Sequence, residues 1–239
     1  METSVLSLIF LFSLFFVFLQ SLRGELKTRF QLYLFLDRYQ YPRFHDLIIP
    51  SSNGTTQLDH VVISKYGVFI VETKSHKGWI FGNENQKNWT QVLFKKKFSF
   101  QNPLRQVYRQ KKILAEFLGI EESKIFSIIY FNGKSHLKTD LPNNVMTSCL
   151  DTYIRSHTDQ LFNDEEVLDL VNRIESFKKN SNLKLADHLE SLQSRHNSMV
   201  TCPRCGGKLL KKVARRGKNA GGEFLGCMNY PRCRFTRDL

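Results

Sequence analysis

The chain has 239 residues, 41% of them hydrophobic and 24% charged, which is typical of a globular protein and excludes a chain that is mostly unfolded. It carries 35 Lys and Arg against 22 Asp and Glu, which gives a formal net charge of +13. So large a positive charge indicates a polyanionic partner, either a nucleic acid or an anionic membrane surface. Charge alone does not choose between them.

An apolar segment lies near the N-terminus. Residues 3–22 contain no charged side chain, and about 20 residues are what a helix needs to cross the hydrocarbon layer of a bilayer. A cleaved signal peptide is the alternative, but it has a basic start and a small-residue cleavage site, whereas Glu2 precedes this run. We therefore expect residues 1–22 to form an uncleaved, single-pass transmembrane anchor. Basic residues follow it at Arg23, Lys27 and Arg29. By the positive-inside rule, the soluble domains are expected on the cytoplasmic side of the membrane.

Periodicity predicts the elements that come next. Apolar side chains at Leu26, Phe30, Tyr33 and Leu34 recur near the helical period and predict an amphipathic helix that ends before Pro42. Short runs rich in β-branched and aromatic residues, separated by glycines, then predict four strands. Their expected ranges are 58–64, 68–75, 78–82 and 88–94.

A helix with clear end signals follows these strands. Asn102 is a suitable cap, Pro103 suits the first turn and Gly119 ends the helix. Its expected inner face contains Leu104, Val107, Tyr108, Lys111, Leu114, Ala115 and Leu118. The apolar run at 124–131 predicts a strand that is buried on both faces, so the fold class is expected to be α/β with a mixed sheet.

Composition divides the chain into four expected parts. Residues 143–150 are predicted to form the last strand of the sheet, and 163–196 are predicted to be helical. After residue 197 the composition changes abruptly to Cys, Gly and Arg. The expected domains are an anchor at 1–22, a main domain at 23–150, a helical closing segment and linker at 151–197, and a small zinc-ribbon domain at 198–239.

The segment "LDHVVISKYGVFIVETK" predicts a β-hairpin with charged residues among Val, Ile and Phe. If the hairpin closes with an even loop, Ile63 faces Val68 and Asp59 faces Glu72, with Lys74 on the same side of the sheet. A three-residue loop would instead place Asp59 on the opposite face from Glu72. The two carboxylates therefore meet only in one register.

Carboxylates opposite each other, with Cβ atoms about 4.5 to 5.5 Å apart, can hold one hard cation, and Mg²⁺ is the natural choice for two carboxylates with several retained waters. Such a site favours phosphodiester hydrolysis, in which Lys74 orients the attacking water or stabilises negative charge. Gln91, on a later strand, is expected to help hold that water. The alternative is an ordinary solvated strand face, on which a Glu and a Lys two residues apart have no catalytic role.

The stretch "GTTQLDHVVISKYGVFIVETKSHKGWIFGNENQKNWTQ", followed by "NPLRQ", resembles the nuclease-related domain of the restriction-endonuclease-like superfamily, over roughly residues 23–133. The resemblance implies a restriction-endonuclease-like core and DNA hydrolysis. The catalytic residues that it implies are Glu25, Asp59, Glu72, Lys74 and Gln91. Of these, Asp59 and Glu72 are implied to be ligands of Mg²⁺, and Glu25 matches the helical glutamate of the family.

Six further cations are candidates for contacts to a phosphate backbone. Three consecutive lysines precede the predicted helix in the sequence, and three cations lie on its expected outer face. They are Lys95, Lys96, Lys97, Arg105, Arg109 and Lys112. A solvated surface is the alternative for all of them.

Four cysteines near the C-terminus have the spacing of a metal site. Cys202, Cys205, Cys227 and Cys233 follow the pattern C-x2-C-x21-C-x5-C. Two such pairs of thiolates close a tetrahedron around Zn²⁺, and a unit of about 40 residues has too small a core to fold without such support. Disulfides are not expected in a cytoplasmic domain. Cys149 is expected to be a buried, small apolar side chain.

The segment that ends in "GGEFLGCMNYPRCRFT" resembles the C-terminal four-cysteine zinc finger of type IA DNA topoisomerases. The resemblance implies binding of DNA, including single strands, without sequence readout, and it does not imply topoisomerase activity. The expected DNA-binding residues are Arg215, Arg216, Lys218, Phe224, Tyr230, Arg232, Arg234 and Phe235. For each aromatic ring, packing beneath the zinc is the alternative.

The combined features predict a membrane-anchored, Mg²⁺-dependent DNA nuclease or DNA-processing protein whose zinc finger holds single-stranded or branched DNA. The alternative is a membrane-tethered DNA-binding adaptor in which the acids of the hairpin do not act. RNA as the ligand, the polarity of cleavage and the oligomeric state stay open.

Overall fold

The computed structural model describes residues 24–239 except 53, 204–206 and 216–219, so the expected anchor at 1–22 lies outside the described residues. The chain forms two compact units, each of which is described by itself below. The first contains Leu58–Asn180 together with the chain up to Leu47, and the second contains Ile48–Gln57 and Ser181–Leu239. Among the described helices, none has the length and apolar character that crossing a membrane requires.

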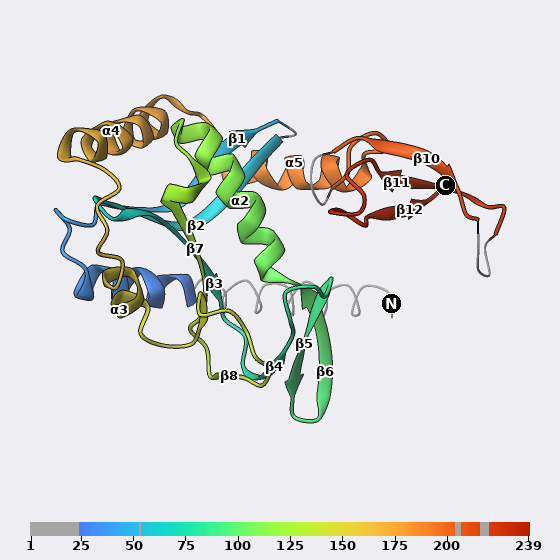
Figure 1. Cartoon of the computed structure of the whole chain (residues 1–239), viewed down its shortest axis with the longest axis horizontal. Helices are drawn as coiled ribbons and strands as arrows, with labels where there is room; N and C mark the ends of the chain where they lie inside the picture. Colours follow the sequence, from blue (N-terminus) through green and yellow to red (C-terminus); the bar gives the residue numbers. More distant parts are fainter. Residues whose placement is uncertain (1–23, 53, 204–206, 216–219) are drawn as a thin grey trace, which may run out of the picture. The chain divides into compact units, whose positions relative to one another are not determined.

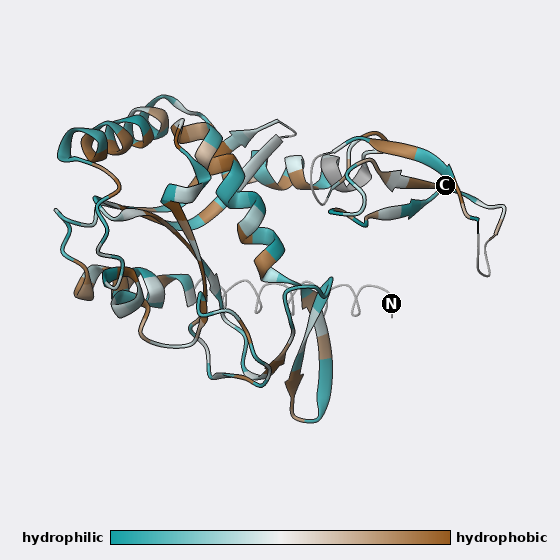
Figure 2. Ribbon diagram, viewed as in Figure 1, coloured by the Kyte–Doolittle hydropathy of each residue, from teal (hydrophilic) through white to brown (hydrophobic). Residues whose placement is uncertain are grey.

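A five-stranded sheet forms the centre of the first unit (Figure 1). Its strand order is β1-β2-β3-β7-β9, in which β2 and β3 are antiparallel while β3, β7 and β9 run parallel, so the sheet is mixed as predicted. The strands are β1 (Arg43–Ser51), β2 (Gly54–Ser64), β3 (Gly67–Lys74), β7 (Ile125–Phe131) and β9 (Val145–Met146). Figure 2 shows the apolar character of the central strands.

Helices cover both faces of this sheet. The helix at residues 24–35 and α3 (Leu150–Arg155) pack against one face, on a cluster that includes Phe69 and Val71. Helix α2 (Pro103–Leu118) packs against the other face, on a cluster that includes Ile129. Because successive side chains of a strand point to opposite faces, the alternation along β3 directs Phe69 and Val71 to one side and Glu72 and Lys74 towards α2. Helix α4 (Asp164–Asn180) contacts the end of α2.

A second, four-stranded sheet of this unit has the order β6-β5-β4-β8. Its strands are β4 (Gly78–Phe81), β5 (Asn88–Leu93), β6 (Lys96–Gln101) and β8 (Ser135–Leu137). Strands β4 and β5 were predicted from the sequence. Strands β6 and β8, and β1 of the main sheet, were not. Strand β6 begins with two of the three consecutive lysines, which were interpreted as a charge run, and β8 is only three residues long.

Asn102 joins the second sheet to α2. Its side-chain Oδ1 accepts a hydrogen bond from the backbone N–H of Leu104 at 3.0 Å, which caps the helix as predicted. Its Nδ2 donates to three backbone carbonyls of the turn between β4 and β5, those of Asn83, Glu84 and Gln86, at 2.8 to 3.1 Å. The side chain is completely buried, so one amide fixes both the start of the helix and the shape of the turn.

The helix at residues 24–35 packs with a different face from the one predicted. Its buried positions recur every four residues at Gly24, Thr28 and Leu32, and Leu36 just beyond the helix continues the series. The predicted apolar face, which begins with Leu26, is exposed. Gly24 is buried because the helix approaches β3 so closely that a Cβ there would lie 1.7 Å from Ser75 Oγ. The inner face was not predicted, because two of its positions are a glycine and a threonine, which do not contribute to an apolar period.

The second unit contains a helix and a three-stranded antiparallel sheet of zinc-ribbon type. They are α5 (Leu185–Asn197), β10 (Leu209–Val213), β11 (Glu223–Cys227) and β12 (Thr236–Asp238). Thr55 contacts α5, where its backbone N–H donates to Ser191 Oγ at 2.9 Å and its Oγ1 lies 2.9 Å from Nδ1 of His188. The helical stretch predicted at 163–196 is divided into α4 and α5 by the nonhelical residues 181–184.

Cys149 is exposed, so the prediction that it is buried is wrong. It precedes the first residue of α3 and has a φ of 58°. The left-handed conformation turns the chain into the helix and leaves the side chain in solvent.

Two histidines of the first unit form a buried pair. Nδ1 of His45 on β1 lies 2.8 Å from Nδ1 of His60 on β2, and His60 is 1% exposed. Burial, with the nearby cation Arg29, lowers the pKa of His45 to about 4. Burial, with His45 and then Arg29, lowers the pKa of His60 to about 3. Both rings are therefore neutral at neutral pH, and one donates a hydrogen bond to the other.

This pair predicts a loss of stability in acid. Because the unfolded chain binds protons near pH 6.5 and the folded chain only near pH 4 and below, stability is complete above about pH 6.5 and falls as the pH decreases through that window. Thermal unfolding followed by circular dichroism should show a fall in melting temperature on the order of 5 °C or more over this window. The double variant His45→Asn, His60→Asn should flatten the dependence, whereas His136→Asn, at an exposed histidine, should not. Equal pH dependence in all three proteins would contradict the prediction.

Candidate active site and metal centre

The register of the β2–β3 hairpin is the predicted one. Ile63 pairs with Val68, and the ladder continues to His60 opposite Val71. Continued by one residue, this register brings Asp59 opposite Glu72. Asp59 Oδ2 accepts a hydrogen bond from the backbone N–H of Thr73 at 2.8 Å, which holds the carboxylate at the end of β3.

Glu72 has a donor on each carboxylate oxygen. Its Oε1 accepts from Lys74 Nζ at 2.6 Å, and its Oε2 accepts from Gln110 Nε2 at 2.8 Å. Lys74 Nζ also donates to Oε1 of Gln106 at 3.0 Å. Glu72 is only 3% exposed, and a buried carboxylate requires such partners because burial of an unpaired charge costs several kcal/mol. The site therefore contains an ion pair within β3, between Glu72 and Lys74, to which two amides of α2 are hydrogen-bonded.

Charges at this site strongly influence one another. Burial, followed by repulsion from Glu72, raises the pKa of Asp59 well above its usual value, although the hydrogen bond from Thr73 and the charge of Lys74 act in the opposite sense. Burial by itself lowers the pKa of Lys74, but the adjacent Glu72 carboxylate outweighs that effect and raises it. Lys74 is therefore a firmly protonated ammonium, and two neighbouring carboxylates share its single positive charge.

Gln106 and Gln110 are site residues that sequence analysis missed. They lie four residues apart on α2, so both point towards β3 from one side of the helix. Gln110 is 2% exposed, whereas Tyr108, which was assigned to the inner face, is 58% exposed. The signal was present in the sequence, because the two amides stand at helical spacing on either side of Val107, which belongs to the predicted inner face.

Glu25 and Gln91 are less closely associated with the hairpin acids. Glu25, in the helix at 24–35, contributes to raising the pKa of both Asp59 and Lys74, so its charge acts on the site. Among the described residues, however, cysteines alone form a group of three or more metal-binding side chains whose ligand atoms all lie within 4.8 Å of one another. Gln91 Nε2 donates to the backbone carbonyl of Lys77 at 2.8 Å. The catalytic roles of Glu25 and Gln91 therefore stay predictions.

The donor set at the hairpin fits a hard divalent cation. Asp59 and Glu72 supply carboxylate oxygens, which are the ligands that Mg²⁺ prefers. Burial first, and then repulsion from Glu72, raises the pKa of Asp59, and the charge of Lys74 does not compensate for both effects. A cation between them would remove that repulsion.

The β5–β6 hairpin presents cations and an aromatic ring to solvent. Phe94 at its turn is 90% exposed, and the following Lys95, Lys96 and Lys97 are exposed as well. Arg105 is half-buried and donates from Nη2 to the backbone carbonyl of Asn85 at 2.8 Å, so it has a structural contact. Arg109 is also half-buried, whereas Lys112 is exposed over the ring of Tyr108. The exposure of Lys95, Lys96 and Lys97 leaves these three side chains accessible to a phosphate backbone.

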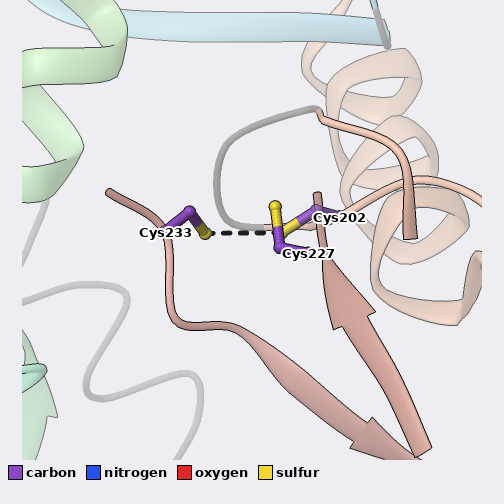
Figure 3. A group of neighbouring side chains, drawn as sticks. All are labelled: Cys202, Cys227 and Cys233. Atoms are coloured by element: carbon purple, nitrogen blue, oxygen red, sulfur yellow. Dashed lines mark hydrogen bonds between the residues drawn. The ribbon is translucent and has the colours of Figure 1, made fainter. Parts of the chain in front are cut away.

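Three cysteines of the second unit converge at a buried centre (Figure 3). The Sγ atoms of Cys202, Cys227 and Cys233 all lie within 4.8 Å of one another, and each side chain is at most 6% exposed. The distance between Sγ of Cys202 and Sγ of Cys233 is 3.7 Å. Sulfurs placed tetrahedrally at about 2.3 Å from zinc are about 3.8 Å apart, so this spacing fits Zn²⁺. The fourth predicted ligand, Cys205, lies outside the described residues.

The aromatic residues near this centre differ in exposure. Tyr230 is 64% exposed, with the ammonium of Lys212 at 5.8 Å from its ring centroid. Phe224 is half-buried and is the cross-strand partner of Lys212. Phe235 packs against the cysteine cluster, which is the alternative that sequence analysis left open. Lys212 is an addition to the predicted set.

The cations predicted to bind DNA are only partly described by the structure. Arg215, Arg232 and Arg234 are exposed, whereas Arg216 and Lys218 lie outside the described residues.

Comparisons with known proteins agree with the two-part organisation. Residues 20–132 match the family model described as nuclease-related domain, and residues 199–239 match the one described as topoisomerase DNA binding C4 zinc finger. An uncharacterised protein of Bacillus anthracis is 40% identical over 141 residues, which cover 54% of this chain and 64% of that protein. No solved structure gives a significant match.

Two topoisomerases resemble a short part of the chain. DNA topoisomerase 1 of Helicobacter pylori is 34% identical over 67 residues, which cover 28% of this chain and 7% of that enzyme. DNA topoisomerase 1 of Archaeoglobus fulgidus is 38% identical over 56 residues, which cover 23% of this chain and 8% of that enzyme. The chain therefore spans less than two thirds of each of these relatives, and the similarity to the topoisomerases is confined to a small fraction of their length.

Because Gln110 donates a hydrogen bond to the buried Glu72, we expect the loss of its amide to lower the stability of the fold. In the variant Gln110→Leu, a buried carboxylate oxygen loses its donor at nearly constant side-chain size, so the free energy of unfolding should fall by about 1 to 3 kcal/mol. Denaturant titration measures this change. The matched control Glu116→Leu, at an exposed position of the same helix, should change stability by less than about 0.5 kcal/mol. Equal effects of the two substitutions would show that the hydrogen bond contributes nothing.

If the cysteine centre binds zinc, the zinc content of the chain should depend on its buried thiols. The variant Cys227→Ser should lose most of the bound zinc, as measured by atomic emission on the purified chain, because a serine hydroxyl is a poor replacement for a thiolate ligand. Hydrogen exchange of β10–β12 should accelerate with it. Cys149→Ser, which removes the exposed cysteine, should retain the zinc content of the unchanged chain. Full zinc content in the Cys227→Ser protein would refute the assignment.

Proposed function

We propose, from the premise that this chain carries a nuclease-related domain followed by a topoisomerase-type C4 zinc finger, that it is a Mg²⁺-dependent DNA nuclease or DNA-processing protein that is anchored in a membrane. Its anchor is the apolar segment at 1–22, and its two units lie on the cytoplasmic side. The reaction is hydrolysis of phosphodiester bonds at the acids of the β2–β3 hairpin. The zinc finger holds the DNA.

One observation carries the proposal. Glu72 is 3% exposed on β3, where Lys74 and Gln110 hold its two oxygens and Gln106 holds Lys74. Burying a carboxylate beside a second acid, Asp59, is unfavourable for a fold and needs a functional reason. A cation site for phosphodiester chemistry supplies one.

Each residue has a distinct role in the proposed reaction. Asp59 and Glu72 hold the divalent ion, which when bound lowers the pKa of a coordinated water and stabilises negative charge on the phosphate. Lys74, which Glu72 and Gln106 hold in place, presents a protonated ammonium to the attacking water or to the charge that develops on phosphate oxygens. Gln110 keeps the Glu72 carboxylate oriented towards Lys74.

The DNA is held by positive charge and by exposed rings. Tyr230 and the half-buried Phe224 offer faces on which unpaired bases can stack, with Lys212 beside both of them. Arg232 and Arg234 are exposed nearby in sequence and contact phosphates. Stacking on rings requires unpaired bases, which supports single-stranded or branched DNA as the substrate.

A specific observation favours a second candidate function. In the structure, Lys74 and Gln110 already occupy both oxygens of Glu72, as they would in a purely structural ion pair. The chain would then be a membrane-tethered DNA-binding adaptor without hydrolytic activity. Removal of one partner of such a pair would destabilise the sheet but would leave DNA binding unchanged.

Cleavage assays with the full chain separate the two functions. Single-stranded, duplex and branched DNA are incubated with and without Mg²⁺, and the variants Glu72→Gln and Lys74→Met are compared with the unchanged chain. We expect Mg²⁺-dependent cleavage that falls about 100-fold or more in each variant, which corresponds to about 2.7 kcal/mol of barrier, while the affinity for DNA is retained. Glu116→Gln, at an exposed acid of α2, should cleave normally.

The controls exclude trivial explanations. Circular dichroism of each variant shows whether loss of cleavage reflects loss of the fold. Binding without cleavage of any substrate by the folded, unchanged chain would refute the nuclease and support the adaptor. Cleavage that persists in folded Glu72→Gln protein would place the chemistry elsewhere.

A further inference from the structure

The helix at residues 24–35 exposes a continuous apolar stripe. Leu26 is 55% exposed, Phe30 62%, Tyr33 66% and Leu34 55%, although all four are large apolar side chains. At about 100° per residue, they lie within roughly one third of the helix circumference. Large apolar side chains that gather on one exposed face mark a site of interaction, whereas isolated ones do not.

The opposite face of this helix is fixed to the sheet, so the stripe stays directed away from the core. Thr28 Oγ1 accepts hydrogen bonds from Asn132 Nδ2 at 2.8 Å and from Thr73 Oγ1 at 3.3 Å. The hydroxyl of Tyr130 donates to Gln31 Oε1 at 2.8 Å. With Leu32 fully buried in the core cluster, the helix has no freedom to rotate the stripe inwards.

Basic side chains border the stripe. Lys27 and Arg29 are exposed on the two sides of it, and Arg38 is exposed just beyond the helix. In the sequence, Gly24, the first described residue of this helix, lies two residues after the uncharged run at 3–22. An apolar face with cations at its borders is the composition of a helix that lies in the interface of an anionic bilayer.

We propose that the stripe formed by Leu26, Phe30, Tyr33 and Leu34 lies in the headgroup region of a lipid bilayer that contains anionic lipids. The inference rests on the proposed membrane anchor, and it adds a second contact that fixes the orientation of the first unit. The apolar rings enter the boundary between headgroups and acyl chains, where aromatic side chains are favourable. Lys27 and Arg29 contact the anionic headgroups.

Continuity of the chain argues for a bilayer as the occupant. An anchor that ends at residue 22 leaves only Arg23 between the end of the membrane span and Gly24. At 1.5 Å per helical residue, the stripe begins within about one turn of the membrane surface. Charge complementarity then selects an anionic surface, because the borders of the stripe carry cations.

Fluorescence of an introduced tryptophan tests this contact. The variant Phe30→Trp of the full chain is reconstituted into vesicles of phosphatidylcholine and phosphatidylserine, and its emission is compared with that of the unchanged chain. The matched control is Tyr108→Trp, at a position on α2 with similar exposure (58%) on the other face of the sheet. We expect a blue shift of the emission added at position 30, and loss of most of that emission when brominated phosphatidylcholine is used. The emission added at position 108 should not change.

The outcomes distinguish the inference from the proposed anchor. Flotation of the vesicles in alkaline carbonate reports the anchor alone, so a chain that floats without quenching at position 30 retains the anchor and refutes the interfacial helix. A chain that does not float refutes the anchor. Emission at position 30 that is shielded from acrylamide but not quenched by brominated lipid would show a protein partner, including a second copy of this chain, and would also overturn the inference.

Charge reversal tests the anionic surface independently. The double variant Lys27→Glu, Arg29→Glu, combined with Phe30→Trp, should lose most of the blue shift in vesicles that contain phosphatidylserine. An undiminished shift would contradict the proposed contact with anionic headgroups.

Discussion

Glu72 is a carboxylate on a strand whose residues from Gly67 to Val71 are all buried. Removing it from water costs several kcal/mol unless its oxygens find partners, and only neighbours on the α2 side of the sheet can supply them. Lys74 supplies one donor from the same strand and Gln110 supplies the other from α2. The partners of this carboxylate therefore act together with the apolar packing of Val107 to fix α2 over the sheet.

The same requirement explains which parts of the site could be predicted. The register of the hairpin follows from local turn geometry, so the sequence predicted Asp59 opposite Glu72 on the condition of an even loop, and the observed ladder meets that condition. Gln110 could not be assigned to a buried position by a search for apolar periodicity, because its burial depends on a partner from a strand that is distant in the sequence. The inner face of the helix at 24–35 was predicted wrongly for a related reason. Its inner positions Gly24 and Thr28 contact polar groups at and just after the end of β3, which apolar periodicity does not reveal.

In the second unit, the candidate metal site could be predicted from residues that are close in the sequence, whereas the exposure of its aromatic rings could not. The spacing of its cysteines was sufficient to predict the metal centre, because ligands close in sequence on two knuckles leave few other arrangements. Which rings remain available could not be predicted, since Phe235 and Tyr230 are both aromatic and both follow a cysteine by a few residues. The backbone carbonyl of Phe235 accepts a hydrogen bond from the N–H of Cys227 at 3.1 Å, and its ring packs against the cysteines, whereas Tyr230 lies in the turn after β11 and is exposed.

The buried amide of Asn102 makes the β4–β5 turn and the first turn of α2 a single rigid body. Strand β6 ends at Gln101, directly before it, so the projecting β5–β6 hairpin belongs to the same body. The hairpin that carries Phe94 at its tip is therefore continuous, through Asn102, with the helix whose Gln106 and Gln110 contact the ion pair.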